Sequence, residues 1–421
     1  MKNSFFKFDQ KIIDYAKTAE SELKDVFSQI DEITEYNQNK VLKAFIDNAI
    51  SESHFAASTG YGYDDRGRDA LESVMAQIMG AEDAIMRHNF VSGTHTIAVA
   101  LFGVLRPGDT MLSCVGTPYD TLHGVIGLTK QNGSLMDFGV KYDEVPLVDE
   151  KPYIEGIKNR LAKSFVKVAH IQRSRGYSLR DSLTVEQVAD IIKAIKEASP
   201  KTIVTVDNCY GEFVQTTEPT EYGADLIMGS LIKNPGGGIA QTGGYIAGKK
   251  EYVEMCANRL TIPGQGKEIG CTMGHSRELF MGLFNAPHVV GEALKTAVFA
   301  SKLFSDLGYN VTPAPFEKRG DIIQTIELMS DKGLIAFCKG IQAGAPIDSF
   351  VVPEPSDMPG YDSKVIMAAG AFTLGASIEL SADGPLREPF AAWMQGGLNY
   401  HSGKTGIMLA AQTMLDDGVI N

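Results

Sequence analysis

Apolar residues follow three different patterns along the chain, and the first covers residues 1–50. This segment contains neither glycine nor proline, and its apolar positions recur at helical spacing, for example at Ile12 and Ile13 and again at Val26 and Ile30. Such spacing is typical of amphipathic helices. We predict two helices here and interpret them as an N-terminal arm that lies on a partner subunit. Ordinary surface helices are the alternative.

The second pattern extends from about residue 60 to 285 and alternates short apolar runs with helical stretches. Helical spacing covers 92–105 and 185–198. Strand-like runs occupy 82–86, 110–114, 166–172, 202–206, 226–228 and 243–247. Strands that alternate with helices indicate βαβ units and a mostly parallel sheet, so we predict an α/β fold. Ligands of such sheets bind at the carboxyl ends of the strands.

The third pattern predicts a smaller α+β domain. A long apolar-periodic helix is expected over 287–307, strand-like pieces over 322–328 and 372–380, and a terminal helix around 405–415. The predicted organisation is therefore an N-terminal helical segment (1–59), a large domain (60–285) and a C-terminal small domain (286–421).

Composition and charge narrow the classes of function. The chain has 421 residues, of which 39 are basic and 52 acidic, for a net charge of −13. This balance argues against nucleic acid and anionic membranes as general partners.

No run approaches the ~20 apolar residues of a membrane span, and no signal-peptide core is present. Five cysteines without CxxC spacing suggest reduced thiols, so a cytoplasmic location is expected. The eight histidines never take metal-ligand spacing, and no catalytic metal is predicted.

One lysine and one aspartate carry the chemical signal. Asp207 ends the apolar run 202–206, and Lys233 follows 26 residues later in a turn rich in serine and glycine (230–238). A lysine amine can form a Schiff base with the aldehyde of pyridoxal phosphate. A carboxylate at a strand end can keep the pyridine nitrogen of that cofactor protonated, so that the ring acts as an electron sink. This pair therefore predicts pyridoxal 5′-phosphate as the cofactor.

Further positions would suit the phosphate and the ring of this cofactor. Ser92, Gly93 and Thr94 open a predicted helix, whose free N–H groups and dipole favour a phosphate. Ser230 adds a hydroxyl donor three residues before Lys233. Tyr119 follows the run 110–114 and is placed to stack on the ring. The alternatives are an ordinary N-cap, a turn residue and a core tyrosine.

Two arginine clusters and one further arginine are candidates for binding anions. The glycine-rich segment 60–69 holds Tyr61, Tyr63, Arg66 and Arg68, whose guanidinium groups suit phosphate or carboxylate. A salt-bridged surface turn is the alternative. An amino-acid substrate also needs its α-carboxylate bound, and the candidates, which spacing does not rank, are Arg173, Arg175 and Arg387.

At this point the chain resembles a known family. It is similar to fold-type I pyridoxal phosphate enzymes of the cysteine and methionine metabolism group, and most similar to the methionine γ-lyase-like or "aluminium resistance" (cystathionine β-lyase-like) proteins. The resemblance spans essentially the whole chain. Its carrying segments are GYGYDDRGRDALE (60–72), SGTHT (92–96), GTPYDT (116–121), HIQRSRGY (170–177), VDNCYG (206–211), GSLIKNPGGG (229–238) and GGLNYH (396–401).

The resemblance implies a large domain with a mostly parallel seven-stranded sheet, a smaller C-terminal domain and an N-terminal arm. It implies that Tyr61 or Tyr63, with Arg66 or Arg68, reaches the phosphate in a neighbouring subunit of a homodimer or homotetramer. The cofactor contacts that it implies are Lys233, Asp207, Tyr119, Gly93, Thr94 and Ser230. The chain departs from better-known lyases at 63–66, 172–175 and 373–376, which bears on the substrate more than on the cofactor.

The expected function is a carbon–sulfur lyase. The substrate would be a small sulfur-containing amino acid such as cystathionine, methionine or cysteine, from which α,β- or α,γ-elimination releases a thiol, ammonia and a 2-oxo acid. An aldolase or an aminotransferase would use the same core residues, and a cofactor-loaded regulatory protein is a non-enzymatic alternative.

A serine acyl hydrolase is a more distant alternative. It is suggested by S-x-x-K at 230–233 and K-T-G at 404–406. It is disfavoured because no S-x-N element lies between them and because the K-T-G precedes a helix-like run where that class needs a strand.

Overall fold

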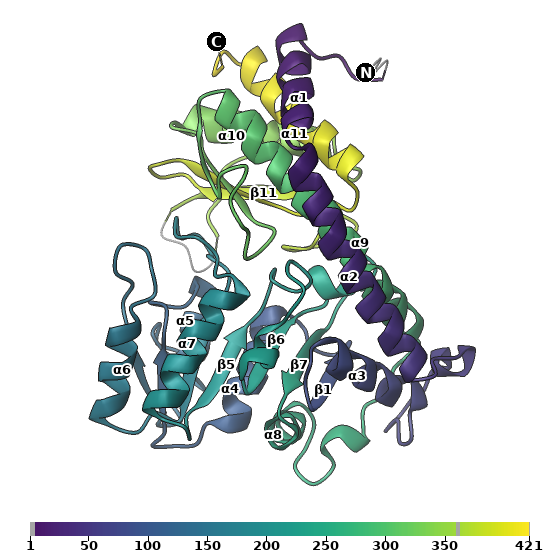
Figure 1. Cartoon of the computed structure of the whole chain (residues 1–421), viewed down its shortest axis with the longest axis vertical. Coiled ribbons are helices and arrows are strands. Elements are labelled where there is room, and N and C mark those ends of the chain that lie inside the picture. The colour runs from purple at the N-terminus through teal and green to yellow at the C-terminus, as the bar shows by residue number, and fades with distance from the viewer. Residues whose placement is uncertain (1–4, 359–362, 421) are drawn as a thin grey trace. The chain divides into compact units, whose positions relative to one another are not determined.

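The computed structural model describes residues 5–358 and 363–420. The chain divides into two compact units, one formed by Tyr36–Pro287 and the other by Met1–Glu35 together with His288–Asn421. Helices α2 (Lys24–Asp47) and α9 (Ser276–Asp306) each contain residues of both units (Figure 1). The boundaries predicted after residues 59 and 285 stay predictions.

The unit Tyr36–Pro287 is built on a seven-stranded sheet in the order β1-β7-β6-β5-β4-β2-β3. Strand β7 runs antiparallel to its neighbours β1 and β6, and the other pairs are parallel. The strands are β1 (Asp83–Arg87), β2 (Thr110–Ser113), β3 (Lys141–Glu144), β4 (Val168–Gln172), β5 (Ile203–Asp207), β6 (Leu226–Ser230) and β7 (Gly244–Gly248). The predicted fold class, with a mostly parallel seven-stranded sheet, is confirmed.

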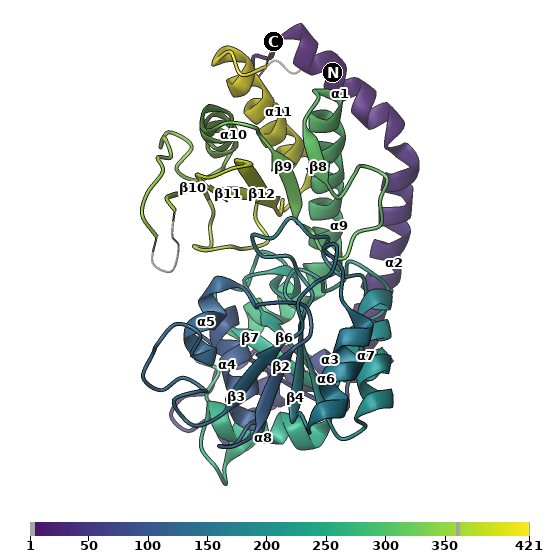
Figure 2. The ribbon, with the colours of Figure 1, turned by 90° about the vertical axis from the view of Figure 1, so that its left-hand side faces the viewer.

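Helices cover both faces of this sheet. Helices α6 and α7 pack together, as do α4 and α8, and Figure 2 shows α6 and α7 on one side of the sheet with α4 and α5 on the other. The helices are α3 (Arg66–Ile78), α4 (Gly93–Val104), α5 (Asp120–Ile126), α6 (Ile154–Lys163), α7 (Val185–Ala198) and α8 (Lys250–Leu260). Because both faces are covered, the central strands β4, β5 and β6 are buried at every position.

Helix α7 illustrates how local sequence determines an element. The Thr184 hydroxyl accepts a hydrogen bond from the Gln187 N–H, and the Gln187 side chain accepts one from the Thr184 N–H. This reciprocal capping box satisfies donors that a helix start otherwise leaves unpaired. Val188, Ile191 and Ile195 then fall on one buried face, as helical spacing requires.

The other unit contains a five-stranded antiparallel sheet in the order β10-β11-β12-β9-β8. Helix α10 packs on this sheet and against α11. The elements are α1 (Gln10–Glu22), β8 (Asn310–Thr312), β9 (Gln324–Glu327), α10 (Asp331–Ala343), β10 (Val365–Ala368), β11 (Ser381–Pro385), β12 (Ala391–Gln395) and α11 (Tyr400–Asp416).

The strand predicted over 372–380 is wrong. This segment forms bends between β10 and β11. The buried carboxylate of Glu379 accepts hydrogen bonds from the N–H groups of Phe372 (2.9 Å) and Thr373 (2.8 Å). A side chain thus takes the donors that a sheet ladder would need, which keeps the backbone in a turn.

The long helix begins earlier than the predicted residue 287. Helix α9 starts at Ser276 and contains Pro287 in its interior. Proline is common at a helix start, which made Pro287 look like a boundary. The buried residues Phe280, Leu283 and Ala286 extend the apolar face on the N-terminal side, so packing continues the helix across the proline.

Two negative findings concern the described residues alone. None of their helices is long and apolar enough to cross a membrane. No group of three or more His, Cys, Asp or Glu side chains within 5–358 and 363–420 is arranged to hold a metal ion.

The K-T-G at 404–406 lies inside α11, where Lys404 pairs with Glu20, so it does not provide the strand that a serine acyl hydrolase requires.

Candidate active site

The carboxyl ends of β5 and β6 bring the predicted lysine and aspartate into one site. Strand β5 ends at Asp207, which is in register with Gln172 of β4 and Met228 of β6. Strand β6 ends at Ser230, and the Lys233 N–H donates to the Ser230 carbonyl (3.3 Å). We call Asp207, Ser230, Lys233 and the adjacent Gly93 the strand-end site.

The turn that carries Lys233 is closed tightly by glycine. A Cβ at Gly236 would lie 1.6 Å from the Leu231 carbonyl oxygen, so no side chain fits there. Lys233 is half-buried as a residue, and its amino group lies over the ring of Tyr210, 4.0 Å from the ring centroid. Burial alone would lower the pKa of Lys233, but the acidic groups around it, Cys209, Tyr210, Asp207 and Tyr119, raise that pKa overall.

Asp207 is a buried carboxylate at 4% exposure. Its Oδ1 accepts a hydrogen bond from the Cys209 N–H (3.1 Å). Burial raises the pKa of Asp207, and the positive charge of Lys233 opposes that rise. A carboxylate in this environment is stabilised by a cationic partner.

The N-terminus of α4 faces the same strand ends. The Ser92 hydroxyl caps the helix by accepting from the His95 N–H (3.0 Å). A Cβ added at Gly93 would make ordinary contacts with the Ser230 Cβ (3.4 Å) and the Cys209 sulfur (3.6 Å), and the glycine leaves that position empty. The Ser230 hydroxyl is buried and has no hydrogen-bond partner among the described residues. An unsatisfied buried donor beside a helix N-terminus indicates a place for an anion.

Tyr119 lies beside this helix N-terminus. Its hydroxyl and the Thr94 hydroxyl are 2.9 Å apart, and its N–H donates to the Gln172 side chain (2.8 Å). Burial raises the pKa of Tyr119, and the charge of Asp207 adds to the rise, so the phenol stays neutral. The structure therefore brings Tyr119 and Thr94 together with Asp207.

The predicted residues of the glycine-rich turn at 60–68 differ in their exposure to solvent. Arg68 is buried and donates to the carbonyls of Gly62 (2.6 Å) and Gly270 (3.1 Å). Tyr61 and Tyr63 are exposed at 73% and 56%, and Arg66 is exposed as well. Arg68 thus stabilises the turn, while the other three side chains point to the surface.

The arginines after β4 are buried rather than exposed to a ligand. Every guanidinium nitrogen of Arg173 donates to the chain, and the side chain has no exposed surface. Arg175 is buried too, and its Nε donates to the Ser182 hydroxyl (3.4 Å). Arg387 belongs to the other unit, directly after β11, and is exposed. Of the three predicted carboxylate ligands, Arg387 is the accessible one.

Arg173 belongs to a buried polar cluster that the sequence did not reveal. Its acceptors include the Asn208 side chain (2.8 Å), whose amide donates to Glu218 (2.9 Å) and to the Tyr245 hydroxyl (3.3 Å). Tyr245 in turn donates to Glu212 Oε1 (2.8 Å). We call these five residues the Arg173 network. Burial raises the pKa of Glu212 to about 8.

The Lys233–Tyr210 contact was also missed. A weak signal existed, because Asn208–Gly211 follows Asp207 directly and has the composition of a turn. Which way the ring of Tyr210 points depends on a positive φ of 69° at this residue, and sequence alone does not specify that.

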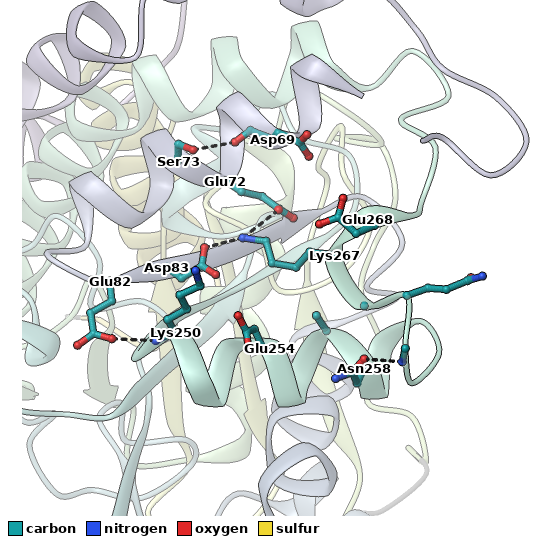
Figure 3. A pocket seen from close by; sticks show the side chains of 14 residues that line it. Asp69, Glu72, Ser73, Glu82, Asp83, Lys250, Glu254, Asn258, Lys267 and Glu268 are labelled. Atoms are coloured by element: carbon teal, nitrogen blue, oxygen red, sulfur yellow. Dashed lines mark hydrogen bonds and ion pairs between the residues drawn. The ribbon is translucent and has the colours of Figure 1, made fainter. Parts of the chain in front are cut away.

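A polar pocket of about 610 Å³ lies among α3, β1, α8 and the segment 264–268, and it does not include the strand-end site. Figure 3 shows Lys267 pointing at Glu72 and Asp83, with which it forms ion pairs. Arg87 donates to the carbonyls of Ile269 (2.7 Å) and Lys267 (3.0 Å). These pairs hold the glycine-rich segment against which the turn at 60–68 packs.

Comparisons with known proteins agree with this geometry. The family model for methionine gamma-lyase matches residues 12–415. A crystal structure of a carbon-sulfur lyase involved in aluminum resistance, from Clostridium novyi NT, is 50% identical over 96% of both chains, with a TM-score of 0.93. A Clostridium acetobutylicum protein, named as a candidate cystathionine beta-lyase involved in aluminum resistance, is 52% identical over 96% of both chains, with a TM-score of 0.94.

An uncharacterized Bacillus subtilis protein, YnbB, is 46% identical over 96% of this chain and 97% of its own length. The resemblance stated from the motifs is therefore confirmed. The family implies pyridoxal 5′-phosphate as the cofactor, as predicted, and the family and its structural relatives indicate a pyridoxal phosphate-dependent carbon–sulfur lyase. This chain belongs to the methionine gamma-lyase family.

Proposed function

We propose that this protein releases a thiol from a small sulfur-containing amino acid, such as cystathionine, methionine or cysteine, by α,β- or α,γ-elimination. The observation that carries the proposal is the convergence of Asp207, Lys233 and the unpartnered Ser230 hydroxyl at neighbouring strand ends. These residues fit pyridoxal 5′-phosphate, which needs an amine, an anionic partner and phosphate donors. When bound, the cofactor supplies an electron sink that no side chain provides.

Lys233 has two roles in this proposal. Its amino group would hold the cofactor covalently, and when free the same group would accept the proton from the substrate α-carbon. The charge of Asp207 helps to keep the amine protonated. Pairing of Asp207 with the pyridine nitrogen would withdraw that charge, lower the pKa of Lys233 and favour the neutral amine that both roles require.

The phosphate would be bound by the N-terminus of α4. The N–H groups of Gly93 and Thr94 and the helix dipole attract an anion, and the hydroxyls of Ser92 and Ser230 supply further donors. Two structural features support this role: Gly93 leaves open space toward Ser230, and the Ser230 hydroxyl has no other partner in the described chain. Tyr119 would then stack on the pyridine ring.

A second subunit would complete the site. Tyr61, Tyr63 and Arg66 are exposed on a turn that Arg68 stabilises internally, which supports their donation to the phosphate of a neighbouring subunit in a homodimer or homotetramer. For the substrate carboxylate we propose Arg387. Unlike Arg173, it is exposed, and a guanidinium group can bind a carboxylate through two hydrogen bonds.

The test is a Lys233→Ala variant, with the exposed Lys201→Ala as its matched control. Cystathionine, methionine and cysteine are each supplied, and the visible absorption of bound cofactor is recorded together with the sulfur product, which is a thiol from cystathionine or methionine and hydrogen sulfide from cysteine. Lys233→Ala should lose the absorption band of lysine-bound cofactor and at least about 10³-fold in turnover, because general acid–base catalysis alone contributes on the order of 10²–10⁴-fold. Lys201→Ala should keep both. A surviving band would contradict the assignment of Lys233.

Product analysis of the wild-type protein separates the alternatives. Thiol together with a 2-oxo acid supports the lyase. With a β-hydroxy amino acid as substrate, release of an aldehyde together with glycine would indicate an aldolase. With an added 2-oxo acid as amino acceptor, formation of a new 2-oxo acid without thiol or ammonia would indicate an aminotransferase. Either of these outcomes would overturn the proposed reaction while leaving the cofactor assignment intact.

A further inference from the structure

Tyr210 presents the face of its ring to the reactive lysine. The Lys233 Nζ lies 4.0 Å from the ring centroid, and Tyr210 itself is buried at 7% exposure. A cation within about 6 Å of an aromatic centroid is attracted by the negative face of the ring, and this attraction grows when water is excluded. The contact therefore acts on the amino group whose charge the proposed reaction changes.

The backbone holds the ring in this position although Tyr210 has an unfavourable backbone conformation. Tyr210 has a φ of 69°, in the left-handed region that residues with a Cβ avoid. The turn is closed by the Gly211 N–H donating to the Asn208 carbonyl (2.9 Å). Arg173 donates to the Asn208 side chain (2.8 Å) and to the Gly211 carbonyl (3.0 Å), so it anchors both ends of the turn.

We infer that Tyr210 is a positioning residue for Lys233, whose free amino group is held by the ring face at the strand ends. The inference rests on the proposed role of Lys233 as the reactive amine. It also gives Arg173 a structural role. In this inference Arg173 fixes the turn that carries Tyr210 and does not bind the substrate carboxylate.

Other groups also face Lys233, and the test has to separate them from the ring. Asp207 comes from β5, Cys209 from the same turn as Tyr210, and Tyr119 from the segment before α5. Asp207 acts through its charge, whereas a neutral tyrosine acts through its ring face, which phenylalanine shares. Leucine keeps apolar bulk at position 210 but has no ring face. The pair Tyr210→Phe and Tyr210→Leu therefore isolates the ring contribution.

The experiment measures the titration of Lys233 in the full-length protein after removal of the cofactor. Acetic anhydride is applied in trace amounts across a range of pH, and acetylation of the Lys233 peptide is quantified by mass spectrometry. Tyr210→Leu should lower the midpoint pH by about one unit, because the ring favours the ammonium form by an amount of that order. Tyr210→Phe should restore the wild-type midpoint. The exposed Tyr222→Leu is the control and should not change it.

Two outcomes would overturn the inference. One is an unchanged midpoint in Tyr210→Leu, and the other is a Tyr210→Phe variant that behaves like the leucine variant, which would assign the effect to the hydroxyl. Thermal unfolding is measured for each variant, and Tyr210→Met replaces Tyr210→Leu if the latter does not fold. The labelling needs no turnover, so a failed lyase assay would leave this result readable. In the enzyme with bound cofactor, kcat should fall about tenfold in Tyr210→Leu because the Lys233 amine is no longer positioned. KM should stay unchanged because Tyr210 is given no contact with the substrate.

Discussion

Two groups of polar side chains lie near the carboxyl ends of the neighbouring strands β4, β5 and β6 and use their hydrogen bonds in opposite ways. In the strand-end site, the Ser230 hydroxyl is buried without a partner in the described chain, and Gly93 keeps space open beside it. In the Arg173 network, every guanidinium nitrogen of Arg173 already donates to the chain. Unused donors next to open space indicate a ligand site, and fully used donors indicate structure.

The comparison explains why two residues predicted from the same kind of sequence signal have different surroundings. Arg173 and Lys233 both follow a buried strand, and both have a residue type suited to an anionic ligand or to chemistry. The acceptors that surround Arg173 come from Leu183, Gly211 and Gln215, which are 10 to 42 residues away in the sequence. A local motif carries no information about such acceptors.

The largest effect is expected from breaking the Arg173 network. Arg173→Gln should destabilise the protein by about 3–5 kcal/mol, because removal of one partner leaves buried acceptors and Glu218 without their cation. Denaturant unfolding measures the change, with the exposed Arg277→Gln as the control. If Arg173→Gln instead raised KM at unchanged stability, Arg173 would be a substrate ligand after all.

A comparable loss, but in turnover, is expected at the strand-end site. Asp207→Asn should lower kcat by about 10²–10³-fold, because loss of one preorganised electrostatic partner typically costs that much. Unfolding should change little, since the amide keeps the volume and can still accept the Cys209 N–H. Steady-state kinetics and unfolding are measured on the same preparations. A large loss of stability with normal kcat would place Asp207 among the structural residues.

A smaller effect, on pH dependence, is expected at Glu212. Its pKa in the folded protein is raised to about 8 by burial. Between the ordinary carboxyl pKa and the raised pKa, Glu212 is protonated in the folded state and ionised in the unfolded state. Its contribution to the free energy of unfolding is therefore complete at low pH and is lost as the pH rises through the folded pKa. Between about pH 6 and 7.5 the wild type should lose about 2 kcal/mol relative to Glu212→Gln, at about 1.4 kcal/mol per pH unit. Parallel stability profiles for the two proteins would contradict a protonated Glu212.

The smallest effect is expected at Ser230. Ser230→Ala should weaken cofactor affinity about tenfold, the value of one hydrogen bond to an anion, and should leave the unfolding of the cofactor-free protein unchanged. Ser301→Ala is the matched control, because that buried hydroxyl already donates to the Pro313 carbonyl (2.8 Å). It should lower stability without affecting cofactor affinity. If Ser230→Ala lowered stability and Ser301→Ala weakened cofactor affinity instead, the proposed phosphate contact of Ser230 would be contradicted.

Local sequence was enough to predict the α/β fold class, the family and the cofactor. Alternation of apolar runs and helical stretches follows from local periodicity, and the motifs around Asp207 and Lys233 are short enough to be read directly. It failed at 372–380, where the Glu379 carboxylate binds the backbone, and at Pro287, where packing carries a helix across a proline.

Packing of distant segments decided which of the predicted polar side chains are buried and which are exposed. It buried Arg68, Arg173 and Arg175, exposed Arg66, and turned Tyr210 toward Lys233. The physical reason is that a side chain becomes available or committed through partners from distant segments. Hydrogen-bond satisfaction is therefore a property of the assembled fold and not of any motif.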